Sequence, residues 1–162
     1  MVSVNDQTIV VTGASGGIGS AIALALAERG ASVCLCGRDA EKLAEIGKGM
    51  SRQHVYPADL SDDRQLEMLV QSIQKENPRI DGLIHGAAAI VLGEVAKAPV
   101  DEFERQFKIN VLVPFRLTQL LLPQLIEAQG QVVFINSSAG LSGKPNVRPA
   151  RNSLTGRPST RA

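Results

Sequence analysis

The chain has 162 residues, 44% of them apolar, and this length and composition predict a soluble globular protein with one domain. Its 17 lysines and arginines nearly balance 16 aspartates and glutamates, so charge gives no reason to expect nucleic acid or an acidic membrane surface as a partner. We find no run of 18 apolar residues and no signal-peptide pattern, and therefore expect a cytoplasmic protein that does not span a membrane.

The chain opens with an apolar run, a glycine-rich turn and a helical pattern. Residues 7–12 are rich in β-branched side chains, and residues 17–29 carry apolar side chains at helical spacing. The turn between them, TGASGGIG, has glycines at Gly13, Gly17 and Gly19, where a side chain would hold an anion away from the backbone. Amides at the start of a helix attract phosphate. The turn is therefore predicted to bind the pyrophosphate of a dinucleotide.

The end of the second apolar run, residues 32–36, indicates which dinucleotide is bound. NAD-binding sheets place an Asp or Glu there to bond the ribose 2′-hydroxyl, whereas this chain has Gly37 and Arg38. An arginine can pair with a 2′-phosphate through two hydrogen bonds. The predicted cofactor is NADP, and NAD is the less favoured alternative. The competing interpretation is a solvated Arg38 whose charge Asp39 neutralises.

The same run contains the only two cysteines, Cys34 and Cys36. Residues two apart on a strand point to one side of the sheet. We expect core thiols rather than a metal site, because no second pair of Cys or His accompanies them.

The remaining pattern alternates helices and strands. It predicts a helix over residues 40–47 capped by Asp39, a weak strand at 54–56, and a helix over 62–76 capped by Ser61. A strand at 80–85 follows. The pattern then predicts a long helix at about 100–128, which Pro114 bends or divides, and a strand at 131–136. Strands separated by helices of ten or more residues form doubly wound parallel sheets. The predicted fold is α/β and Rossmann-like, with about five strands and an incomplete C-terminal side.

The predicted dinucleotide-binding domain covers residues 1–143, and residues 144–162 break its pattern. This last segment contains three prolines, several arginines, no acidic residue and no apolar periodicity. We expect an irregular basic tail, disordered or out of frame. A basic arm that touches phosphates is the alternative.

The order of these motifs resembles the short-chain dehydrogenase/reductase family from about residue 5 to residue 143. The resemblance is carried by T-G-x-x-x-G-x-G at residues 12–19, Asp59-Leu60 after the third strand, Asn110 in the long helix, and N-S-S-A-G at residues 136–140. It implies hydride transfer between NADP(H) and a small-molecule alcohol or ketone.

The resemblance also assigns roles to individual residues. It implies that Ser137, with Ser138 as the second choice, is the catalytic serine, and that Asn110 orders a water near the active site. Ser137 would lie beyond the carboxyl end of a parallel strand, where its hydroxyl can donate to a carbonyl oxygen. The competing interpretations are that Ser137 closes a turn and that Asn110 satisfies backbone groups. The implied cofactor-binding residues are Gly13, Ser15, Gly17, Ile18, Gly19, Arg38, Asp59, Leu60 and Gly86.

Two departures from the family pattern are visible. The family's Asn-Asn-Ala-Gly after the fourth strand is His85-Gly86-Ala87-Ala88 here, and we expect His85 to be structural rather than catalytic. The family's Tyr-x-x-x-Lys is absent beyond Ser137, because the chain's one tyrosine, Tyr56, belongs to the third strand. Arg151 falls at the lysine position, where it keeps the charge but changes the shape.

Without that tyrosine the proton donor of a reductase is missing. We therefore expect a chain that is truncated or shifted near residue 147, or a catalytically empty remnant, and in either case an inactive one. A non-catalytic dinucleotide-binding module is the alternative function. A homo-oligomer formed through the long helix at about 100–128 is the expected partner arrangement.

Overall fold

The structure is a computed structural model that describes residues 3–91 and 94–137. Strands and helices alternate along the chain from the first strand to the last. Their order is β1 (Thr8–Thr12), α1 (Gly17–Ala27), β2 (Ser32–Gly37), α2 (Ala40–Gly47), β3 (Gln53–Pro57), α3 (Asp63–Glu76), β4 (Gly82–His85), a 3-10 turn (Val95–Lys97), α4 (Val100–Phe107), a π-helical segment (Lys108–Leu112), α5 (Val113–Glu127) and β5 (Gln131–Phe134).

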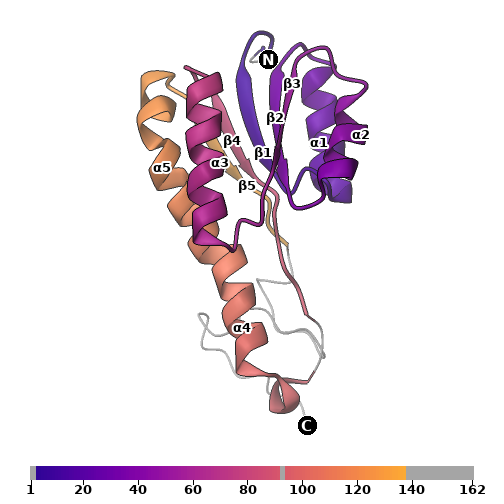
Figure 1. Ribbon diagram of the computed structural model, residues 1–162, viewed down its shortest axis with the longest axis vertical. Coiled ribbons are helices and arrows are strands. Elements are labelled where there is room, and N and C mark those ends of the chain that lie inside the picture. The colour runs from indigo at the N-terminus through magenta and orange to yellow at the C-terminus, as the bar shows by residue number, and fades with distance from the viewer. Residues whose placement is uncertain (1–2, 92–93, 138–162) are drawn as a thin grey trace.

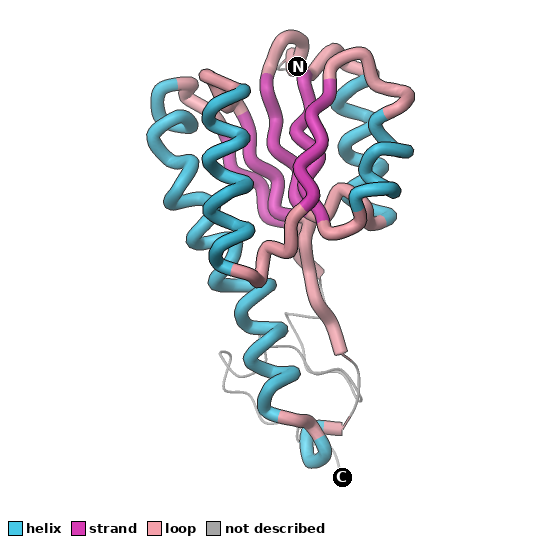
Figure 2. Tube along the Cα trace, viewed as in Figure 1, coloured by secondary structure: helices cyan, strands magenta, loops and turns pink. Residues whose placement is uncertain are grey.

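The five strands form one parallel sheet in the order β3-β2-β1-β4-β5. Helices α1 and α2 cover one face of the sheet, and α3 and α5 cover the other (Figures 1 and 2). The inner strands β1, β2 and β4 are largely buried between the helices, which explains why β1 and β2 read as continuous apolar runs, whereas the edge strands β3 and β5 are partly exposed. The predicted Rossmann-like fold is confirmed.

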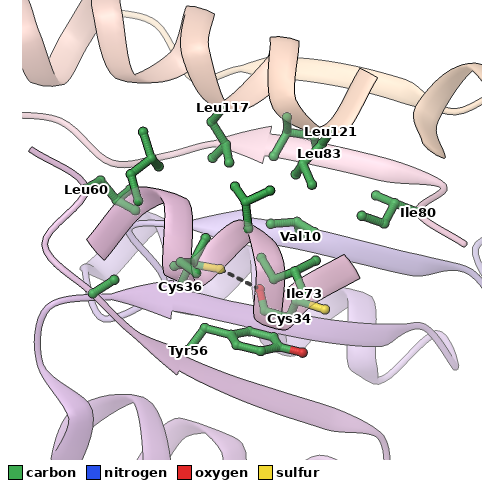
Figure 3. Close-up of a cluster of buried hydrophobic side chains, with 14 of the residues drawn as sticks. Val10, Cys34, Cys36, Tyr56, Leu60, Ile73, Ile80, Leu83, Leu117 and Leu121 are labelled. Carbon is green, nitrogen blue, oxygen red and sulfur yellow. Dashed lines mark hydrogen bonds between the residues drawn. The ribbon is translucent and has the colours of Figure 1, made fainter. Parts of the chain in front are cut away.

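The larger core cluster lies between the sheet and the pair α3 and α5 (Figure 3). Cys34 and Cys36 point into it together from β2, as the two-residue spacing predicted, and both thiols are fully buried. Burial raises the pKa of Cys34 to about 12 and raises that of Cys36 well above its usual value. Both cysteines are therefore inert core residues in the folded protein.

One of the two predicted helix caps is right and the other is wrong. Asp39 caps α2, because its carboxylate accepts a hydrogen bond from Lys42 N at 3.0 Å. Ser61 does not cap α3. Asp62 does so by accepting from the backbone N–H groups of Arg64 and Gln65, while the Ser61 hydroxyl donates to Asp59. Helix α3 consequently begins one residue later than predicted.

The predicted break at Pro114 takes the form of a change in helical hydrogen bonding. The segment Lys108–Leu112 is π-helical, and α5 begins at Val113 with Pro114 in its first turn. Proline has no backbone N–H, so it cannot donate to the carbonyl of Asn110 four residues earlier. A wider turn at this point keeps α4 and α5 in one continuous helical stretch (Figure 1).

The helical stretch Val100–Glu127 is long and apolar enough to cross a membrane by length and composition alone. That is weak evidence for a membrane location, because the core helix of a soluble protein meets the same criterion. In this fold Leu117, Leu121 and Leu125 of the stretch pack into the core beneath α5.

The two faces of α5 predict opposite effects of truncation. Replacing fully buried Leu117 with alanine removes core contacts and should lower the free energy of unfolding by about 2–5 kcal/mol. The matched control, Phe115→Ala, alters a side chain that is 67% exposed and should change it by less than about 0.5 kcal/mol. Urea denaturation followed by circular dichroism measures both, and equal losses would contradict this packing.

Candidate functional site

A cavity of about 190 Å³ opens at the carboxyl ends of β1, β2, β3 and β4. The turn after each of these strands contributes to its wall, and α4 with the π-helical segment closes one side. This is the edge of a doubly wound sheet at which ligands bind. The lining includes predicted cofactor residues from every turn, namely Gly13, Ser15, Arg38, Asp59, Leu60 and Gly86.

The glycines of the β1–α1 turn are needed for different structural reasons. Gly13 has φ +69°, and a Cβ there would lie 2.6 Å from Ala87 N. A Cβ at Gly19 would overlap the carbonyl of Gly13. The protein itself requires these two glycines. Gly17 is different, because a Cβ there would meet no protein atom within 4 Å. Because Gly17 has no side chain, the space in front of α1 stays open, which suits close approach of a ligand to the backbone.

The start of α1 presents backbone donors to that space. Gly16 precedes the helix and offers no side-chain cap, and the first bond of the helix is Ser20 N to Gly16 O at 2.8 Å. The amides of residues 17–19 therefore have no acceptor inside the helix. Ile18, the second residue of the helix, is 65% exposed. Unpaired amides at the positive end of a helix dipole fit a pyrophosphate.

Thr12 fastens the end of β1 to the turn after β4. Its Oγ1 donates to Ile84 O and accepts from the N–H groups of Gly86 and Ala87 at 3.1 and 3.2 Å. Gly86 is needed for this approach, since a Cβ there would lie 2.7 Å from Thr12 O. The two turns that floor the cavity are thus joined by one hydroxyl.

Arg38 lines the cavity, where its charge acts on the carboxylate of Asp59 without forming an ion pair. The structure gives it no hydrogen bond or ion pair with any described residue. The neighbouring Asp39 accepts from Lys42 N as the cap of α2 instead of pairing with Arg38. The interpretation in which Asp39 neutralises Arg38 therefore has no support from the contacts.

Asp59 stands at the cavity in a fixed, ionised form. Its Oδ1 accepts hydrogen bonds from Ser61 Oγ at 2.6 Å and Ser61 N at 2.9 Å. The hydrogen bond from the Ser61 hydroxyl, with smaller contributions from Arg38 and Arg105, holds the pKa of Asp59 below its usual value. A carboxylate held in this way can accept a hydrogen bond from an amino group of a ligand. Leu60 beside it belongs to both the core and the cavity wall.

The side chain of Asn110 holds the segment after β4 through the backbone of Ala89. Its Oδ1 accepts from Ala89 N at 2.9 Å and its Nδ2 donates to Ala89 O at 2.8 Å. One helical turn earlier, buried Gln106 accepts from Val91 N. These contacts agree with the interpretation that Asn110 satisfies backbone groups, and its catalytic role stays a prediction. Gln106 was not predicted from the sequence, although two amide side chains four residues apart, Gln106 and Asn110, are a visible signal.

Ser137 is exposed beyond the end of β5 and does not belong to the cavity wall. Its catalytic role also stays a prediction. Ser138 and Arg151 lie outside the described residues.

His85, which ends β4, is a packed core residue. Its ring is 5% exposed, contacts Thr118 Oγ1 through Nε2 at 2.9 Å, and stacks on Phe134 with the ring centroids 4.8 Å apart. Burial lowers the pKa of His85 to about 4, so the imidazole is neutral near pH 7. These contacts support the structural role expected for this residue.

Tyr56 does not line the cavity, and its hydroxyl belongs to a hydrogen-bond network with Glu76 and Asn77. Its hydroxyl donates to Glu76 Oε2 at 2.8 Å and accepts from Asn77 Nδ2 at 2.9 Å. Burial, helped by the hydrogen bond to Glu76, raises the pKa of Tyr56 well above its usual value. Its ring packs in the core cluster (Figure 3) rather than in the cavity wall.

Over residues 3–91 and 94–137, no group of three or more His, Cys, Asp or Glu side chains is arranged to hold a metal ion.

Comparison with known proteins identifies the family. The family model described as short chain dehydrogenase matches residues 7–149. The chain belongs to the short-chain dehydrogenase family. Members of this oxidoreductase family use a nicotinamide dinucleotide, NAD or NADP.

Curated relatives and a solved structure agree with this assignment. The chain is 37% identical over 155 residues to the uncharacterized oxidoreductase YciK of Escherichia coli (strain K12), with 88% of this chain and 60% of YciK covered. It is 35% identical over 160 residues to the uncharacterized oxidoreductase YvaG of Bacillus subtilis (strain 168), with 94% of this chain and 58% of YvaG covered. The crystal structure of the KRED1-Pglu enzyme superposes with a TM-score of 0.85 at 25% identity, over 91% of this chain and 63% of that one. The chain spans about 60% of the length of these relatives.

The buried His85 predicts a pH dependence of stability. Its folded pKa of about 4 lies below the unfolded value near 6.5, so its stabilising contribution is complete above pH 6.5 and is lost as the pH falls towards 4. The loss should reach no more than about 3 kcal/mol at pH 4. Urea titrations of the wild type and His85→Asn from pH 7 to pH 4 isolate the contribution of His85 to the free energy of unfolding. Parallel pH profiles for the two proteins would contradict it.

Proposed function

We propose that this chain binds NADP(H) and prefers it to NAD(H). The observation that carries the proposal is Arg38, an unpaired cation on the cavity wall at the end of β2, where NAD-binding sheets place a carboxylate. A phosphate bound to the ribose 2′-oxygen would supply the anion that Arg38 lacks. A hydrogen bond between charged groups contributes about 1.5–3 kcal/mol, which is enough to set the preference.

The other parts of the cofactor would be held by the residues around the same cavity. Gly13, Ser15, Gly17, Ile18 and Gly19 would hold the pyrophosphate through the backbone of the turn and of the start of α1. The carboxylate of Asp59 and the side chain of Leu60 would hold the adenine, and the small Gly86 leaves room beside the pyrophosphate.

We propose that the chain does not by itself transfer hydride at a useful rate. NADPH supplies a hydride when bound, but reduction of a carbonyl also needs a proton donor at the carbonyl oxygen. The one tyrosine of these 162 residues, Tyr56, has its hydroxyl engaged by Glu76 and Asn77. In this proposal Ser137 would donate a hydrogen bond to a carbonyl or alcohol substrate, and Asn110 would hold the loop beside the cofactor.

A cytoplasmic location is proposed as well. It is supported by membership of a generally soluble family and by the core packing of the apolar face of α5. The runner-up function is an NADP-dependent reductase of small alcohols or ketones, supported by the family alone.

The cofactor preference can be tested by titration calorimetry with NADPH and NADH. The wild type should bind NADPH more tightly, and Arg38→Gln should lower the affinity for NADPH by about tenfold to a hundredfold, the loss of one charged hydrogen bond, while leaving that for NADH nearly unchanged. Arg64→Gln removes an exposed arginine outside the cavity wall and serves as the matched control. Equal affinity of the wild type for both cofactors would overturn the proposed preference.

The expected lack of turnover is checked by following NADPH absorbance with a panel of small ketones and aldehydes. The rate should not exceed that of NADPH in buffer, because no described residue of the cavity wall is a tyrosine. Ser137→Ala serves as the control. Turnover that depends on Ser137 would show that another proton donor acts in this chain and would favour the runner-up function.

A further inference from the structure

Arg105 is the second cation on the cavity wall, and no sequence motif assigns it a role. It lies on α4, far along the chain from Arg38, yet both line the cavity that also holds Asp59. Over the described residues these three are the only charged side chains of the wall. The two arginines can therefore bind different parts of one ligand.

Arg105 shares the cavity wall with the apolar residues Ala58, Leu60 and Ile109, here called the apolar slot. Ile109 follows Arg105 by four residues and shares its face of the helical stretch, and both side chains line the cavity. Leu60 and Ala58 contribute the apolar wall after β3. Asp59 lies beside them, close enough that the charges of both arginines act on its carboxylate. An ionised carboxylate next to apolar walls matches a flat ring that carries an amino group.

Glu102 holds the guanidinium of Arg105 through its Nε edge and partly neutralises its charge. The Nε of Arg105 donates to Glu102 Oε2 at 3.3 Å, and its terminal Nη groups have no partner among the described residues. Arg38 has no carboxylate in ion-pair contact among the described residues and acts on Asp59 only at longer range. A dianionic phosphate is therefore matched better by Arg38, while the flat, charge-compensated guanidinium of Arg105 is suited to lie over an aromatic ring.

We infer that Arg105 lies over the adenine ring of the bound cofactor and holds it in the slot beside Leu60 and Ile109. Arg105 is thus a residue for purine recognition, whereas Arg38 recognises the 2′-phosphate. Glu102 is a positioning residue that orients the guanidinium through Nε. The inference rests on the proposed function, because it requires an adenine dinucleotide in this cavity.

Two fragments of the cofactor separate the roles of the two arginines. The dissociation constants of 5′-ADP and 2′,5′-ADP are measured by calorimetry on the full chain. Arg105→Ala should weaken binding of both fragments by the same factor, about threefold to thirtyfold, because both contain adenine. Arg105→Gln, which keeps much of the side-chain length but removes the charge, should weaken both as well. Arg38→Gln should weaken 2′,5′-ADP alone, and Arg64→Ala should change neither.

The outcomes that overturn the inference differ from those that overturn the proposed function. If Arg105→Ala leaves both affinities unchanged, Arg105 is only the helix-surface partner of Glu102. If it weakens 2′,5′-ADP alone, Arg105 is a phosphate ligand and the assignment to adenine is wrong. Failure of the wild type to bind either fragment would instead overturn the proposed function. Circular dichroism of each variant confirms that it is folded, which is expected because the Arg105 side chain is 46% exposed.

Discussion

The site depends on a close backbone approach between the end of β1 and the turn after β4. Gly13 and Gly86 lie where any Cβ would collide with the opposite backbone, and the Thr12 hydroxyl joins the two segments. This contact brings the turns after β1 and β4 together at the floor of the cavity. A single added methyl group at Gly13 would separate the floor of the cavity, so the glycines set the geometry before any ligand is bound.

The fold could be predicted from sequence because apolar runs and helical spacing alternate clearly from β1 to β5. Local competition for hydrogen bonds was harder to predict. Three consecutive residues after Leu60 can each cap a helix, and Ser61 lost this role because its hydroxyl is used by Asp59. The π-helical segment before Pro114 was likewise not predicted beyond a bend or boundary. A proline marks where a helix must adjust, but the packing around it decides how.

The site was predictable where its residues follow strands, and less so where they come from a helix. Arg38 was found because it follows a strand whose end marks the ligand edge of the sheet, and Asp59 and Gly86 were found because the family motifs that they match also follow strands. Gln106 and Arg105 were missed because their roles depend on how α4 lies against the segment after β4, which no motif encodes. For Tyr56 the sequence was sufficient. Its place in the third strand already excluded it as the proton donor expected after β5, and the structure adds Glu76 and Asn77 as the partners of its hydroxyl.

The two thiols of β2 give this protein an internal reporter of its own opening. Cys34 and Cys36 are fully buried and protonated, so an alkylating reagent cannot react with either thiol until the sheet separates from α3 and α5. Since the chain has no other cysteine, the rate of labelling reports the opening of this core alone. A ligand that binds only the closed protein, at the carboxyl edge of the sheet where β2 ends, would slow that labelling by the factor 1 + [L]/Kd, even if the ligand absorbs no light and undergoes no reaction.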